Sequence, residues 1–239
     1  MFSDFRKTIE ASEPAYFLGT IALTGPDKNS PHVTDGQQRL STTSILLSAI
    51  QDCFHKKGND SKANWIENDW LMVYDPDEDR KLSRMTLNVD DRAYFSDHIA
   101  TRPGDSKRQG KPKGRSNELL QQAIKSANEH VGDLVKGYSD TDAAKKLAKW
   151  VKWITDYALV IVLYLPNDLN AFQMLETLND RGLKTSQVDI IKIFLFSKAG
   201  DRMSQVQPVW SKAMGLLDSL ESDDIALQFL RHFVTTVRL

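Results

Sequence analysis

Residues 33–41 read VTDGQQRLS and join a predicted strand to a predicted helix. The extended run ends at Thr34, Asp35-Gly36 is a turn pair, and an apolar helical pattern begins at Leu40. Three long polar side chains fill the junction: Gln37, Gln38 and Arg39. A purely structural connection does not need such side chains, so the junction is the first place to look for a binding site.

The segments on either side of this junction predict a strand, turn and helix unit. Residues 16–23, YFLGTIAL, are rich in strand-forming residues and end at a turn cluster, residues 24–27. A short second strand is predicted at 32–34. From Leu40 the apolar side chains recur at helical spacing as far as Phe54, and Lys56-Lys57-Gly58 is a suitable helix end.

The remainder of the chain predicts a helix-rich α+β protein. A strand is expected at 84–89, a helix from a cap at Asp90 to about Ile99, and helices at 117–136 and 141–157. The continuous apolar run 159–165 predicts a strand covered on both faces. Further helices are expected at 169–179, 187–199, 204–220 and 224–237. These elements divide into an α/β part at 1–100, a basic flexible loop at 101–115 and a mainly helical part at 116–239.

Composition narrows the class of protein. The chain has 239 residues, of which 41% are hydrophobic, so it can bury a core. It contains no run of eighteen apolar residues and no apolar signal segment at its start, so we expect a cytoplasmic protein without membrane contact. The single cysteine, Cys53, lies at an apolar helical position and is interpreted as a core residue. The net charge of −1 means that any nucleic-acid binding must use a local patch.

The first junction has the chemistry of an anion site. The first N–H groups of a helix have no partner inside the helix and carry partial positive charge. Gly36 permits close approach of a ligand, Arg39 offers a planar fork for phosphate, and Asp35 would hold Mg²⁺ or orient water. Hydroxyls follow in the first turn: Ser41, Thr42 and Thr43. A structural interpretation fits equally well, with a turn, a helix cap and a surface ion pair of Arg39. The spacing matches neither a Walker loop nor GxGxxG.

A second polar junction occurs at residues 178–192, LNDRGLKTSQVDIIK. Gly182 is typical of a helix end, and Ser186 with Asp189 resembles a capping box for the next helix. Three polar residues are left unexplained by this helix hairpin: Asn179, Arg181 and Lys192. They are candidates for the same anion as the first junction.

Residues 102–115, RPGDSKRQGKPKGR, form a basic segment interrupted by Gly and Pro. The basic residues are Arg102, Lys107, Arg108, Lys111, Lys113 and Arg115. Such a segment predicts a mobile loop. Two interpretations stand: a solvated insertion, or a loop that orders on the phosphate backbone of DNA. The acidic tract 75–79 is interpreted as a solvated loop, because it lacks the pattern of a calcium site.

The two junctions together identify a family resemblance. The segments FLGTIAL, DGQQRLSTTSILLSAI and MLETLNDRGLKTSQVDIIKIFLF resemble the DGQQR-motif family, the N-terminal domain of GmrSD-type restriction systems. This resemblance covers nearly the whole chain. It implies a ParB/sulfiredoxin-like fold for the first part and membership of a defence system that restricts modified phage DNA. It also implies nucleoside-triphosphate (NTP) binding and hydrolysis at the DGQQR site, with Mg²⁺ as cofactor.

The resemblance assigns residues as well. Asp35, Gln37, Gln38 and Arg39 would be catalytic, and phosphate would be bound by Gly36, Arg39 and the following hydroxyls together with Asn179, Arg181 and Lys192. The second motif either completes this site or only shapes the helical part. Gly182, Ser186 and Asp189 would shape the second motif. Family members usually begin with an upstream IPxYQR-like segment and end in an HNH nuclease. Here only the end of a first helix, residues 2–9, is expected to remain, and the five isolated histidines predict no nuclease site.

Three functions therefore remain open at this point. The first is an NTP-binding and hydrolysing regulatory domain of a modification-dependent restriction system. The second is a DNA-binding module without NTP turnover that uses the basic loop and Arg39. The third is a scaffold for an HNH nuclease domain or subunit. The nucleotide, the DNA modification and the oligomeric state are not encoded in any motif of this chain.

Overall fold

The computed structural model describes residues 1–11, 13, 15–25, 27 and 30–165, and beyond these 188, 191, 195, 199, 202–218, 225, 228 and 229. The chain divides into two compact units. The first comprises residues 1–20 and 36–161, and the second comprises residues 21–35 and 162–239. The two strands β1 and β5 each continue from one unit into the other.

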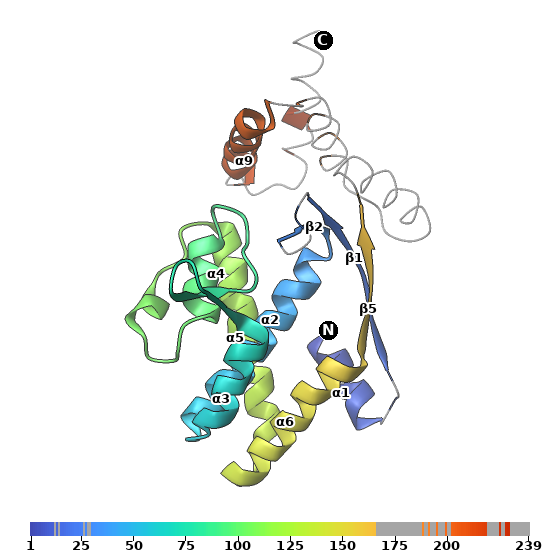
Figure 1. The fold of residues 1–239 in the computed structure, drawn as a ribbon, viewed down its shortest axis with the longest axis vertical. Coiled ribbons are helices and arrows are strands. Elements are labelled where there is room, and N and C mark those ends of the chain that lie inside the picture. Colours follow the sequence, from blue (N-terminus) through green and yellow to red (C-terminus); the bar gives the residue numbers. More distant parts are fainter. Residues whose placement is uncertain are drawn as a thin grey trace. The chain divides into compact units, whose positions relative to one another are not determined.

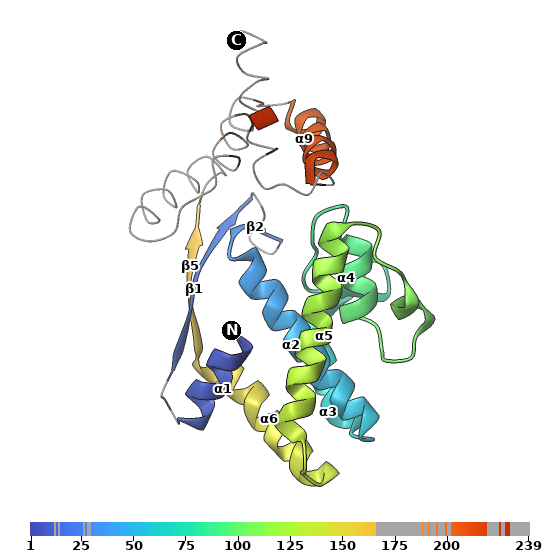
Figure 2. The ribbon, with the colours of Figure 1, turned by 180° about the vertical axis from the view of Figure 1, so that it is seen from behind.

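Helix α2, Gln37–Lys56, is the centre of the first unit (Figures 1 and 2). Its middle turns, residues 45–52, are buried on every side because four other helices pack around it. These helices are α3 (Asp60–Ile66), α4 (Arg92–Ile99), α5 (Arg115–Val135) and α6 (Asp140–Tyr157). The predicted helices at 117–136 and 141–157 are confirmed as α5 and α6. The cap of α4 is Asp91 rather than Asp90.

One apolar core joins these helices. It contains Ile50 and Phe54 of α2, Val131 of α5 and Leu147 of α6 among its fully enclosed side chains. Helix α1, Phe2–Glu10, closes one side of the core through Phe5, which is 0% exposed. The Phe5 ring meets Trp153 of α6 edge-on at a centroid distance of 5.9 Å. The first-turn end of α2 lies beyond this core, and its residues are half-buried or exposed.

A short hairpin follows α3. A π-helical turn, η1 (Glu67–Leu71), leads into β3 (Met72–Asp75), which pairs antiparallel with β4 (Arg80–Ser83). The strand predicted at 84–89 is therefore wrong: the strand lies earlier, and residues 84–89 are irregular. The acidic tract 75–79 forms the exposed hairpin turn, in which Asp75 Oδ1 accepts from the Asp77 and Glu78 backbone.

The sheet has the strand order β2-β1-β5 and is small and mixed. Strand β1 is Tyr16–Thr24, β2 is His32–Asp35 and β5 is Ala158–Tyr164. Strands β1 and β2 pair antiparallel, Thr24 opposite His32, with an irregularity after Ala22. The predicted strands at 16–23 and 32–34 are confirmed.

The strand predicted at 159–165 is present as β5, but its burial on both faces is wrong. Ile161 is 52% and Tyr164 is 60% exposed, and these two side chains differ by an odd number of positions, so both faces are open. The physical reason is that cover of a face comes from a layer packed on the sheet, and at Val160 and Ile161, which point to opposite faces and are 39% and 52% exposed, no layer among the described residues encloses the side chain. Here a continuous apolar run indicates a strand, but it does not indicate that other elements bury the faces of that strand.

The fold class is confirmed as helix-rich α+β, while the ParB/sulfiredoxin-like topology stays a prediction. In the second unit, α9 spans Met203–Asp218 and confirms the helix predicted at 204–220. The helix predicted at 169–179 lies outside the described residues. Across the parts of the chain that are described, no helix combines the length and apolar character that crossing a membrane requires.

Candidate functional site

The DGQQR run joins β2 to α2: Asp35 ends the strand, Gly36 is the helix cap, and Gln37, Gln38 and Arg39 are the first residues of the helix. The helix begins at Gln37, three residues before the predicted apolar start at Leu40, and Leu40 N donates to Gly36 O at 3.1 Å. Gly36 is the N-cap, is buried, and has φ 87° and ψ 4°. A residue with a Cβ would be strained in this left-handed conformation, so glycine is needed to turn β2 into the helix.

The electrostatics of this helix end favour an anion. Gly36 has no side chain with which to cap the helix, and no acidic residue lies in the first turn. The partial positive charge of the N-terminus is therefore not neutralised by a carboxylate in that turn. Gln37 and Gln38 are exposed there and supply amide groups that donate as well as accept hydrogen bonds.

Arg39 is held by the neighbouring strand. Its Nη1 donates to the Thr20 carbonyl oxygen of β1 at 2.9 Å. Its side chain lies directly against Gly19: a Cβ at residue 19 would stand 3.0 Å from Arg39 Nε and 3.2 Å from Arg39 Cζ. The half-buried guanidinium is thus fixed beside the first turn of α2 and is not a freely moving surface group.

Two of the three predicted hydroxyl ligands hydrogen-bond within α2. Ser41 Oγ donates to Gln38 O at 3.2 Å, and Thr43 Oγ1 donates to Arg39 O at 2.8 Å. A hydroxyl binds phosphate by donating its proton, so Ser41 and Thr43 would have to rotate about χ1 to do so. Thr42 is half-buried in the same turn.

Asp35 is the last residue of β2 and directly precedes Gly36 in the chain. Its side chain is half-buried. Within the described ranges no group of three or more His, Cys, Asp or Glu side chains is arranged to hold a metal ion. A magnesium ion at Asp35 would therefore take most of its ligands from phosphate and water.

The second predicted junction cannot be placed. Its candidate residues lie outside the described part of the chain: Asn179, Arg181, Gly182, Ser186, Asp189 and Lys192. Their roles stay predictions.

Comparison with protein families decides the identity of the chain. Residues 1–196 match the model of the GmrSD restriction endonuclease, N-terminal domain. The chain belongs to the GmrSD N-terminal domain family. It is accordingly a component of a restriction or defence system, and the family links it with DNA and a partner nuclease domain. A search of curated proteins found no match to this chain.

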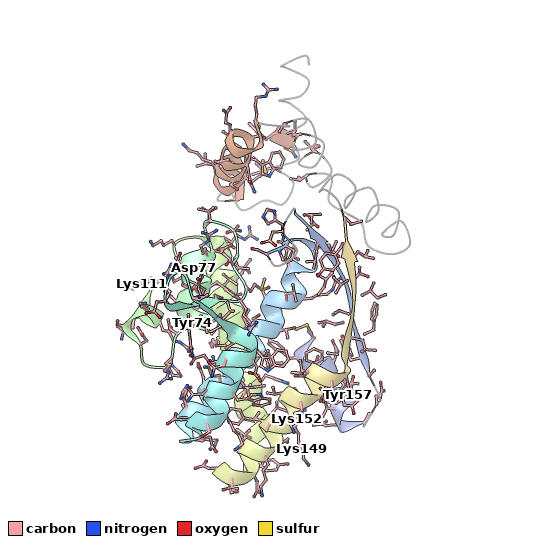
Figure 3. The ribbon with its side chains drawn as sticks, in the orientation of Figure 1. Tyr74, Asp77, Lys111, Lys149, Lys152 and Tyr157 are labelled. Carbon is pink, nitrogen blue, oxygen red and sulfur yellow. The ribbon has the colours of Figure 1, made fainter. Side chains whose placement is uncertain are left out.

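The basic segment of this GmrSD domain is partly structural. It contains a short 3₁₀ turn, η2 (Ser106–Gln109), and Arg108 points inward to Asp52 of α2, with Nη1 2.5 Å from Oδ2. Arg108 also donates from Nε to Thr101 O at 2.8 Å. Arg102 lies 3.8 Å from Glu67, Nε to Oε2. The Arg102 side chain is nevertheless 64% exposed, and the remaining predicted DNA contacts are exposed as well: Lys107, Lys111, Lys113 and Arg115. Figure 3 shows Lys111 on the outside of this segment.

Sequence reasoning missed the part that β1 plays in the site. Gly19 and Thr20 were interpreted only as strand residues, yet they contact the Arg39 side chain. A signal was available, because a glycine inside a strand often marks a close approach of another group to the backbone. The sequence does not say which group approaches.

Proposed function

We propose that this GmrSD domain binds a nucleoside triphosphate at the start of α2 and hydrolyses it as the regulatory domain of a modification-dependent DNA restriction system. The observation that carries the proposal is Arg39, fixed by Thr20 beside a helix N-terminus that has no acidic residue in its first turn. A planar guanidinium and a positive helix end are complementary to phosphate oxygens.

Each residue of the run has a role in this proposal. Arg39 binds phosphate, and the backbone after Gly36 supplies N–H donors. Gln37 and Gln38 orient phosphate or the attacking water. Asp35 holds Mg²⁺ through water or positions the nucleophile, and the ion would supply charge neutralisation of the phosphates. Asn179, Arg181 and Lys192 of the second motif would complete the phosphate contacts.

Calorimetric titration of ATP and GTP, with and without Mg²⁺, tests binding. We expect Arg39→Ala to weaken binding at least about tenfold, because a hydrogen bond to a charged partner contributes about 1.5–3 kcal/mol. Arg84→Ala is a matched control, because Arg84 also donates to a backbone carbonyl, that of Asn68 at 3.0 Å, but lies on the hairpin side of the unit. Absence of heat with every nucleotide, or equal losses in both variants, would refute the proposal.

DNA binding without NTP turnover is the second candidate, and the exposed cations of the basic segment favour it. Lys107, Lys111 and Lys113 lie within a span of seven residues and are exposed. Contacts of this kind to the phosphate backbone release counterions, so affinity should fall steeply with salt. A DNA mobility shift that persists in Arg39→Ala, but disappears when the three lysines become glutamine, would favour this function over the nucleotide site.

A further inference from the structure

We propose that Gly19 is the positioning residue for Arg39: at Gly19-Thr20 the strand β1 has backbone without a side chain at residue 19, and the guanidinium is held against it. The inference rests on the proposed function, in which Arg39 contacts phosphate. It adds that the productive orientation of Arg39 is set by a strand residue that lies outside the DGQQR run.

The contact distances support the role of Gly19. Its backbone has φ +116°, a conformation that residues with a Cβ rarely adopt. A Cβ at this position would stand 3.0, 3.2 and 3.4 Å from Arg39 Nε, Cζ and Cδ. The contact at 3.0 Å lies at the lower limit of real packing, and all three atoms belong to the guanidinium end of the side chain. A methyl group at residue 19 would therefore push the planar group away from the strand.

The next residue also holds the group. Thr20 O accepts from Arg39 Nη1 at 2.9 Å, so contact at Gly19 sets the distance from the strand and the hydrogen bond sets the rotation of the plane. A guanidinium has several N–H donors in one plane, and the hydrogen bond to Thr20 O uses one of them. An arginine ordered in advance loses less conformational freedom on binding, which raises affinity.

A matched glycine separates positioning from simple backbone strain. Gly25 has almost the same conformation, φ +115°, but a Cβ there would meet the His32 backbone N at 3.6 Å and Pro31 Cα at 4.0 Å, which are ordinary contact distances. Gly19→Ala and Gly25→Ala thus introduce similar strain, and only the first disturbs Arg39. We expect Gly19→Ala to weaken nucleotide binding about tenfold and Gly25→Ala to leave it within about twofold of the original.

The test combines this pair with a spectroscopic measurement that needs no nucleotide. The Nε–H resonance of Arg39, assigned in a ¹⁵N correlation spectrum by its loss in Arg39→Lys, should shift or broaden in Gly19→Ala and stay in place in Gly25→Ala. An unchanged resonance in Gly19→Ala would overturn the positioning role. If the wild-type chain binds no nucleotide, the proposed function fails, while the resonance still decides whether Gly19 orients Arg39.

A second variant covers the case in which Gly19→Ala does not fold. In Gly19→Ala the new methyl group contacts the Arg39 guanidinium. The double variant Gly19→Ala with Arg39→Ala removes this contact, so it should fold as well as Gly25→Ala. Where the single variant folds, Gly19→Ala should cause no additional loss of nucleotide affinity in the Arg39→Ala background. A failure to restore folding, or an additional loss of affinity about as large as in the wild-type background, would show that Gly19 acts independently of Arg39.

Discussion

Replacing Arg108 by methionine should destabilise the first unit strongly, although sequence alone groups Arg108 with surface cations. The Arg108 side chain is 15% exposed and its partner Asp52 is 8% exposed. Methionine keeps much of the aliphatic volume and removes the charge together with the hydrogen bonds to Thr101 O. The substitution therefore tests the ion pair more than the packing of the chain.

The expected loss of stability follows from the Asp52 carboxylate, which is left without its partner. In the variant the Asp52 carboxylate remains enclosed without its cation, and its Oδ1 already has no hydrogen-bond partner among the described residues. Breaking a buried pair by removing one partner typically costs about 3–5 kcal/mol. Because Asp52 is not completely enclosed, we expect the lower part of this range, about 3 kcal/mol. Replacing both residues, Asp52→Leu with Arg108→Met, should recover most of the loss, because no unpaired charge remains.

Urea denaturation followed by tryptophan fluorescence measures this change. Four of the five tryptophans report on the first unit: Trp65, Trp70, Trp150 and Trp153. Lys111→Met is the control, since it removes an exposed cation from the same segment and should change the free energy of unfolding by less than about 0.5 kcal/mol. Equal stability of the Arg108 and Lys111 variants would refute the ion-pair argument and return Arg108 to the group of candidate DNA contacts.

Two further perturbations probe the same unit. Burial lowers the pKa of His130, whose Nε2 is enclosed without a partner among the described residues. As pH falls, the unfolded chain therefore takes up a proton at this residue before the folded chain does. The free energy of unfolding should decrease as pH drops from about 6.5 towards the lowered pKa, by at most about 1.4 kcal/mol per pH unit. Denaturation across this window should lose that slope in His130→Gln but not in His32→Gln, an exposed histidine; equal slopes in both would contradict the assignment. Asn117→Ala should lower the free energy of unfolding, measured by urea denaturation, by about 1.5–3 kcal/mol, because Asn117 Nδ2 donates to the buried Asp91 carboxylate at 2.7 Å. Asn128→Ala is the control, because it removes only a hydrogen bond within its own helix. An equal or smaller decrease for Asn117→Ala than for Asn128→Ala would refute this prediction.

The helices around the core were predictable because their apolar residues repeat with the period of the helix. In α5 the spacing of Ala127, Val131 and Leu134 places all three on one stripe, and all three are buried. The boundaries of α5 and α6 fall within two residues of the predicted ones. Periodicity carries this information locally, so the prediction needed no knowledge of which helix packs on which.

The hairpin and β5 show where local patterns were insufficient. Residues 84–89 have strand-forming composition, but pairing in the hairpin is fixed by the turn at 75–79, which places Arg80 opposite Asp75. For β5, the run of β-branched residues predicted the strand correctly and its cover incorrectly. Whether another layer packs on the face of a strand is a property of the tertiary structure, and a sequence pattern records it only indirectly.

The candidate site also contains one feature that could be predicted from the sequence and one that could not. Gly36 could be recognised from sequence because a turn glycine before a helical pattern implies a left-handed residue, and the structure has it with φ 87°. The contact between Gly19 and Arg39 could not be recognised from sequence, because it joins a strand to the first turn of a helix and depends on the distance between their backbones. Since the guanidinium rests on a position where a Cβ would intrude, the glycine in FLGTIAL and the arginine in DGQQR form one structural requirement. A substitution at either residue should be judged by what it does to the other.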